Sequence, residues 1–116
     1  MPIPLYQAKA EFFRTLGHPA RIRVLELLNE RDHAVHELLA EIDIEPSNLS
    51  QQLAVLRRAG LVTQRREGSQ VVYAISAPEV RDLLVAARRI LLGIITDQDA
   101  LKPQLRAPVA VGRPPR

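Results

Sequence analysis

The spacing of apolar residues along the first half of the chain predicts four helices. Apolar side chains recur every three or four positions over residues 5–16, 19–29, 34–42 and 46–59, the period of one helix face. Short polar or Gly-Pro segments separate them. Pro19 and Pro46 fit the first position of a helix, where the missing N–H costs nothing, and Gly60 is typical of a helix end.

After Gly60 the pattern changes to alternation. Residues 61–66 and 70–76 are expected to form two strands around a turn at 67–69, with Val71, Tyr73 and Ile75 on one face. A long helix then follows from Pro78 to about residue 101. The sequence therefore predicts a mainly α fold with a small β-hairpin, a winged helix-turn-helix in the order α-α-α-α-β-β-α. Residues 1–102 would form a single domain, and the Pro-rich residues 103–116 a disordered tail.

Composition narrows the class of protein. The 116 residues suffice for one domain, and the absence of cysteine excludes disulfides and thiolate metal sites. We find no apolar run long enough to span a membrane and no signal-peptide pattern, so we expect a cytoplasmic protein without a membrane partner. No phosphate-binding glycine loop or nucleophile-base set is present, which argues against an enzyme and predicts no cofactor.

The helix over 46–59 combines an apolar face with an uncharged polar face. Leu49, Leu53 and Leu56 repeat at the spacing of a buried face, and no charged residue lies between Pro46 and Leu56. An ordinary surface helix usually carries Glu and Lys instead. Asn and Gln can bond bidentately to adenine in the major groove, and Ser can donate or accept. We therefore expect the following residues to contact DNA: Ser47, Asn48, Ser50, Gln51 and Gln52.

Arginines gather around the hairpin. Arg57, Arg58, Arg65 and Arg66 face a single acid, Glu67, and this local balance of +3 equals the formal net charge of the whole chain. A wing with arginines beside a recognition helix would reach flanking phosphates or the minor groove, so Arg57, Arg65, Arg66 and the turn residue Ser69 complete the expected DNA contacts. For Arg57 and Arg58, stabilisation of the helix dipole is an equal alternative.

A second hypothesis is a protein–protein interaction module that keeps this fold without binding DNA. Acidic or apolar residues over positions 47–52 would indicate such a module, and the sequence has neither. Arginine supplies 14 of the 16 basic residues, which is compatible with nucleic-acid binding but does not by itself establish it.

Two segments resemble the ArsR-type (arsenic-repressor-like) bacterial transcriptional regulators. "LGHPARIRVLELL" is similar to the family's "LGdptRlrIL" segment, and "LSQQLAVLRRAGLVTQRREGSQVVYAI" to its recognition helix and wing. The resemblance implies a homodimer that represses a promoter by binding a palindromic double-stranded operator and is released by an inducing signal. It also implies that the first and last helices pack on the partner, and the apolar stripes nominate Leu5, Phe12, Leu84, Leu91, Ile94 and Ile95 for that interface.

The metal sites of many relatives are missing from this chain. The family's "ELCVCDL" motif corresponds to residues 33–38, where Ala34 and His36 replace the two cysteines. The last helix has aspartates but no histidine, so the zinc site of other relatives is absent as well. His33 and His36 are weak metal candidates, which we interpret as ordinary surface residues, and we expect His18 to cap a helix. The inducer, a small molecule or a metal, is not identified by the sequence.

Overall fold

The computed structural model describes residues 2–94, and its first four helices agree with the predicted ones to within about two residues. Their sequence boundaries follow the expected signals: Pro19 and Pro46 each occupy the first helical position. His18 caps the second helix, because its Nδ1 accepts the Ala20 N–H at 3.2 Å, as expected. The helices are α1 (Leu5–Leu16), α2 (Pro19–Glu30), α3 (Val35–Glu41) and α4 (Pro46–Arg58).

The end of α4 explains how the chain turns into the sheet. Gly60 has φ +81°, a conformation that only glycine adopts without strain. The Leu61 N–H donates to Leu56 O and the Gly60 N–H to Arg57 O, both at 3.0 Å, which is the Schellman arrangement. The helix therefore stops where the sequence predicts, and Leu61 and Val62 enter the core.

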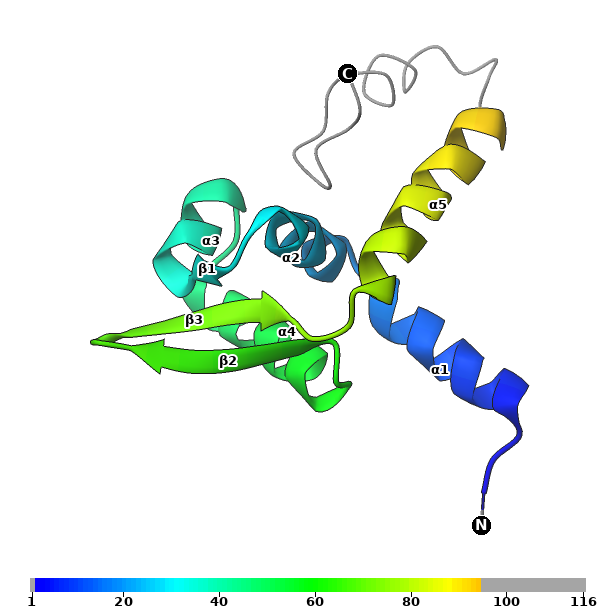
Figure 1. The fold of residues 1–116 in the computed structure, drawn as a ribbon, viewed down its shortest axis with the longest axis horizontal. Coiled ribbons are helices and arrows are strands. Elements are labelled where there is room, and N and C mark those ends of the chain that lie inside the picture. The colour runs from blue at the N-terminus through cyan, green and yellow to red at the C-terminus, as the bar shows by residue number, and fades with distance from the viewer. Residues whose placement is uncertain (1, 95–116) are drawn as a thin grey trace.

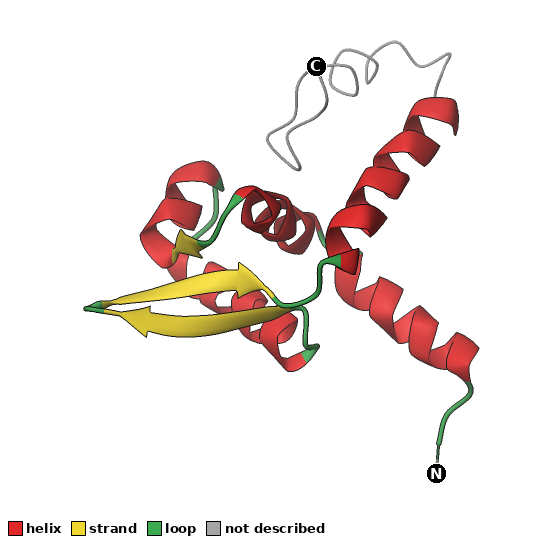
Figure 2. Cartoon of the chain, in the orientation of Figure 1, coloured by secondary structure: helices red, strands yellow, loops and turns green. Residues whose placement is uncertain are grey.

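Two predicted strands form the hairpin of Figures 1 and 2, and a third strand was not predicted. β2 (Val62–Glu67) pairs antiparallel with β3 (Gln70–Ile75) through a two-residue turn in which Gly68 has φ +63°. β1 (His33–Ala34) pairs with the other edge of β3, so the sheet order is β1-β3-β2. A strand of two residues is too short to show alternation, which is why the pattern gave only the hairpin.

The core lies between α2, α3, α4 and the sheet. Tyr73 and Ile75, two of the three residues predicted to share one face of β3, pack against it, and Val72 on the other face is also buried. The apolar face of α4 is fully enclosed, and this leaves its opposite face outward. The largest fully buried side chains are Leu25, Leu38, Leu49, Leu53, Leu56, Val24 and Val62.

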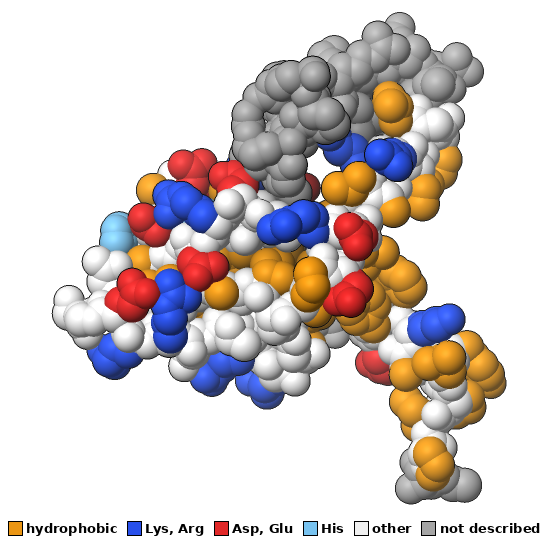
Figure 3. Space-filling view, viewed as in Figure 1, with side chains coloured by type: hydrophobic (Ala, Val, Ile, Leu, Met, Phe, Trp, Pro, Cys, Tyr) orange, Lys and Arg blue, Asp and Glu red, His pale blue; other side chains and the backbone are white. Residues whose placement is uncertain are grey.

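The first and last helices extend away from this core. α1 and α5 (Glu79–Ile94) meet at one side of the molecule and diverge from there in Figure 1. Only Leu16 of α1 and Val80 of α5 are buried, and apolar side chains line both helices in Figure 3. Within residues 2–94, every helix is too short or too polar to span a lipid bilayer. The predicted continuation of α5 to residue 101 and the tail at 103–116 lie outside the described residues.

Candidate nucleic-acid interface

The outward face of α4 carries four uncharged polar side chains. Ser47, Asn48, Ser50 and Gln51 are all exposed, in the first two turns of the helix. Burial of Leu49, Leu53 and Leu56 on the other side fixes the rotation of the helix. The structure thus brings these four predicted residues together at one exposed helix end, which offers both hydrogen-bond donors and acceptors.

Gln52 does not belong to that face, and the expectation that it would is wrong. The side chain is buried, with an exposed fraction of 8%. Its Oε1 accepts a hydrogen bond from Arg21 Nε at 2.7 Å, and its Nε2 donates to Asn48 Oδ1 at 2.8 Å. Position 52 lies one turn after Asn48 and beside Leu53, at the edge of the buried stripe. Gln52 therefore connects α4 to α2 and orients Asn48 instead of standing free in solvent.

Arg21, which donates to Gln52, also forms a hydrogen bond with the end of α1. Arg21 Nη1 donates to Thr15 O at 3.0 Å, so α1, α2 and α4 are joined through one guanidinium. Sequence patterns did not indicate this connection because 31 positions separate Arg21 from Gln52. The position of α4 therefore depends on α2.

Three of the four predicted arginines have free guanidinium groups. Arg57, Arg58 and Arg66 are exposed, and their guanidinium groups make no hydrogen bond or ion pair with any residue of the described part of the chain. Arg57 and Arg58 occupy the last turn of α4, where a positive charge also favours the helix dipole. Basic side chains gather along the lower edge of Figure 3, beneath the hairpin and α4. The turn residue Ser69 is exposed as well.

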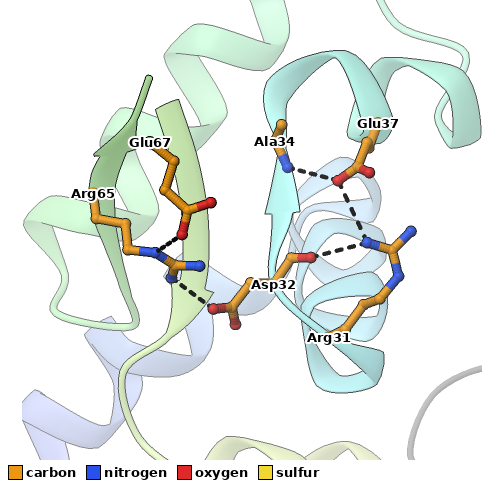
Figure 4. A network of polar contacts seen from close by, with 6 residues as sticks. All are labelled: Arg31, Asp32, Ala34, Glu37, Arg65 and Glu67. Carbon is orange, nitrogen blue, oxygen red and sulfur yellow. Dashed lines mark hydrogen bonds and ion pairs between the residues drawn. The ribbon is translucent and has the colours of Figure 1, made fainter. Parts of the chain in front are cut away.

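Arg65 differs from these three because it is held by two carboxylates. Its Nη1 donates to Asp32 Oδ2 and its Nε to Glu67 Oε2, each at 2.6 Å, as Figure 4 shows. These hydrogen bonds, first from Asp32 and then from Glu67, raise the pKa of the Arg65 guanidinium above its ordinary value. Arg65 is therefore positively charged and already paired in the free protein.

A second set of contacts fixes the start of α3. Glu37 Oε1 accepts the Ala34 N–H at 2.9 Å, and Arg31 Nη1 lies 3.5 Å from the same oxygen. The hydrogen bond from the Ala34 backbone lowers the pKa of the Glu37 carboxyl, and the charges of Arg31 and His33 add to this against the effect of burial. A side chain at the third helical position that accepts an N–H at the helix start stabilises that start.

This lowered pKa predicts a pH-dependent stability. Because the folded pKa of Glu37 lies below its ordinary value of 4.5, the carboxylate stabilises the fold above that pH, and the contribution is lost as the pH falls through the lowered pKa. We expect Glu37→Gln to lower the melting temperature at pH 7 and the difference from wild type to close on acidification.

Thermal unfolding from pH 7 down to pH 3 measures this, with Glu41→Gln as the matched control. Glu41 is exposed at the other end of α3 and has no ion pair with the described residues. A difference for Glu37→Gln that stays constant over the whole pH range, or an equal pH-dependent loss in Glu41→Gln, would contradict the role given to Glu37.

The two metal candidates lie in different environments. His36 is exposed, as expected, but His33 is buried in β1, so its interpretation as a surface residue is wrong. His33 Nδ1 lies 3.5 Å from Glu37 Oε1, and its ring has no hydrogen-bond partner within the described chain. No group of three or more His, Asp or Glu residues within positions 2–94 is placed to hold a metal ion.

The predicted dimer residues divide into two sets. Leu5, Leu91 and Ile94 are exposed on α1 and α5, with Leu5 and Ile94 about 70% exposed. Phe12 and Leu84 are half-buried against the core of the same chain. Ile95 lies outside the described residues. Other large apolar side chains that the prediction did not name are also exposed there: Tyr6, Phe13 and Ile90.

Three packed helices, α2 to α4, followed directly by the β2–β3 hairpin define the winged helix-turn-helix class of fold. Residues 18–64 match the family described as "Bacterial regulatory protein, arsR family". The chain is 56% identical over 105 residues to the HTH-type transcriptional regulator Rv0081 of Mycobacterium tuberculosis, covering 90% of this chain and 92% of that protein. The chain belongs to the arsR family and is a winged helix-turn-helix transcriptional regulator.

Solved structures and a further relative agree with this assignment. The crystal structure of M. tuberculosis Rv0081 superposes with a TM-score of 0.77 and covers 84% of this chain and 98% of that one, at 56% identity. The chain is 38% identical to a biofilm growth-associated repressor of Agrobacterium fabrum, over 74% of this chain and 77% of that protein. A homodimeric winged helix-turn-helix DNA-binding domain of Mycobacterium bovis has a TM-score of 0.63 at 26% identity, over 84% and 85% of the two chains.

Proposed function

We propose that this regulator binds a palindromic double-stranded DNA operator as a homodimer, represses transcription in the cytoplasm, and leaves the operator when an inducing signal arrives. The observation that carries the proposal is that two suitable surfaces, the polar face of α4 and a group of exposed arginines, lie side by side. The exposed uncharged face of α4 can read base edges, and the free arginines beside it can bind the phosphates that flank them.

Each DNA contact follows from the chemistry of the exposed side chain. Gln51 and Asn48 can bond bidentately to adenine, and Ser47 and Ser50 can donate or accept. Arg57 and Arg66 have unpaired guanidinium groups for phosphate, and Ser69 lies at the tip of the hairpin. Gln52 is excluded from direct contact because it is buried, and its role is to hold Asn48 in place.

Dimerisation follows from the apolar faces of α1 and α5. A single chain leaves Leu5, Tyr6, Phe13, Ile90 and Ile94 more than half exposed, although transfer of such side chains from water is favourable. A second copy would cover them. Support comes from the M. bovis relative, whose solved domain is homodimeric. Two recognition helices related by a twofold axis would then read a palindrome.

Fluorescence anisotropy with the DNA upstream of the protein's own coding sequence tests this function. We expect binding at moderate salt that is much tighter than binding to a scrambled duplex of equal length and weakens as salt increases. Equal affinity for the two duplexes would refute sequence-specific regulation. A dimer that shows no salt-dependent association with either duplex would favour the alternative function, a protein–protein interaction module.

A further inference from the structure

Arg65 and Arg66 are adjacent on β2 but lie on opposite faces of the sheet, because successive side chains of a strand alternate. Their neighbours on β3 are Val72 and Val71, respectively. Arg66 has no ion pair with the rest of the described chain, whereas Arg65 contacts two carboxylates. The two arginines of the wing are therefore chemically different, although the sequence makes them look equivalent.

The surroundings of Arg65 are unfavourable for a phosphate. The network in Figure 4 contains two positive and three negative side chains, so that its formal charge is −1. A phosphate approaching Arg65 would meet this net negative charge and would compete with two carboxylates that are already 2.6 Å from the guanidinium. The charged side chains of the network in Figure 4 are Arg31, Asp32, Glu37, Arg65 and Glu67.

The contact between Arg65 and Asp32 crosses the sheet. β3 lies between β1 and β2, and Asp32 immediately precedes β1, so the side chain of Arg65 must span β3 to reach it. Val72, which is opposite Arg65 in register, is only 7% exposed although it faces away from the core. One ion pair thus joins the outermost strand of the wing to the segment on the far side of the sheet.

The segment that receives Arg65 is itself anchored to α3. The Asp32 carbonyl accepts a hydrogen bond from Arg31 Nη1 at 3.2 Å, and Glu37 of α3 accepts the Ala34 N–H two residues later. Since α3 is the helix that precedes the recognition helix, Arg65 connects the wing to the helix-turn-helix unit. A hairpin of two strands alone is only marginally stable, so its direction depends on such contacts.

We propose that Arg65 is a positioning residue that holds the wing at a fixed angle to α4, so that Arg66 reaches a DNA phosphate. Arg65 itself makes no phosphate contact in the complex. The proposal rests on the DNA-binding function proposed above and corrects the equal roles that the sequence gives to the two arginines.

The variants Arg65→Gln and Arg66→Gln are matched, because each removes one positive charge from adjacent positions of β2. Anisotropy with the upstream DNA over a series of salt concentrations gives the slope of log K against log salt for each. Arg66→Gln should flatten the slope by about 1.8 per dimer, which corresponds to two lost phosphate contacts at about 0.9 each. Arg65→Gln should weaken binding about threefold to tenfold at an unchanged slope, because Arg66 keeps its charge and still reaches the phosphate once the freed wing is ordered on the DNA, so that only the cost of ordering is added.

Hydrogen exchange of the wing amides in the free protein provides a readout that does not depend on DNA. Arg65→Gln should accelerate exchange over β2 and β3, whereas Arg66→Gln should leave it unchanged. The double variant Asp32→Arg, Arg65→Asp reverses the ion pair. It is made in a Glu67→Gln background, because a carboxylate at position 65 would otherwise face Glu67, and we expect it to return exchange toward the rate of Glu67→Gln alone. An unchanged helical signal and melting temperature by circular dichroism shows that each variant is folded.

Three results would overturn the proposal. A slope flattened equally by both single variants would make Arg65 a phosphate contact. Unchanged exchange and unchanged affinity in Arg65→Gln would show that its ion pairs position nothing, and failure of the reversed pair to slow exchange would break the link to Asp32. If the wild type itself does not prefer the upstream DNA, the proposed function fails, while the exchange data on the free protein still decide whether Arg65 positions the wing.

Discussion

Leu91→Glu is expected to convert the protein to a monomer and to weaken operator binding by at least about a hundredfold. Leu91 is 49% exposed on α5, outside the core of its own chain, so the variant should remain folded. In a dimer interface the new carboxylate would have to be buried without a partner, which is strongly unfavourable. A monomer would then bind one half-site alone and lose the gain of about 10²- to 10⁴-fold that simultaneous binding gives.

Light scattering at micromolar concentration measures the mass, and anisotropy on the upstream DNA measures the affinity. Arg89→Gln is the matched control, because it changes the net charge by the same amount two residues away, roughly on the opposite side of α5. The control should remain dimeric. A Leu91→Glu protein that is still a dimer, or a monomer that binds the operator as tightly as wild type, would contradict the role of α5.

Gln51→Ala is expected to relax sequence preference at one base pair of each half-site. Gln51 is exposed on the second turn of α4, and a bidentate contact from its amide to adenine contributes about 1–3 kcal/mol of discrimination against other bases. The loss should be confined to that base pair, since Gln51 carries no charge, and the salt slope should stay unchanged.

Anisotropy on operator duplexes substituted one base pair at a time gives this preference. Gln7→Ala is the control of the same residue type, exposed on α1 away from the recognition helix. An equal loss of affinity for every duplex, including a scrambled one, would show that Gln51 does not read a base. Relaxed preference in the Gln7→Ala variant would show that the effect is not specific to α4.

Regular periodicity made most of this fold predictable. The helices are predictable because buried residues such as Leu49, Leu53 and Leu56 repeat at the helical period, and the end of α4 because glycine, here Gly60 with a positive φ, is typical of a helix end. β1 was missed because two residues cannot display a period. Ser47, Asn48, Ser50 and Gln51 are exposed, as the pattern predicts, but Gln52 lies at the edge of the apolar stripe and is buried.

The pairing of polar side chains could not be predicted in the same way. Arg65 bonds to Asp32 across 33 positions and Arg21 to Gln52 across 31, and no local pattern encodes which distant partner a guanidinium meets. The sequence indicates a wing with arginines but not that Arg65 would be paired with two carboxylates. His33 is buried for a similar reason: its strand is covered by elements that are far away in sequence.

Backbone amide NMR spectra of the full chain, with and without the upstream duplex, test the central claim most directly. We expect the largest shifts at Ser47, Asn48, Ser50 and Gln51 in α4 and at Arg66 and Ser69 in the wing, because these residues are exposed and chemically suited to bases and phosphates. Large shifts confined to α1 and α5, with α4 and the wing unchanged, would contradict the assignment of the DNA-binding surface.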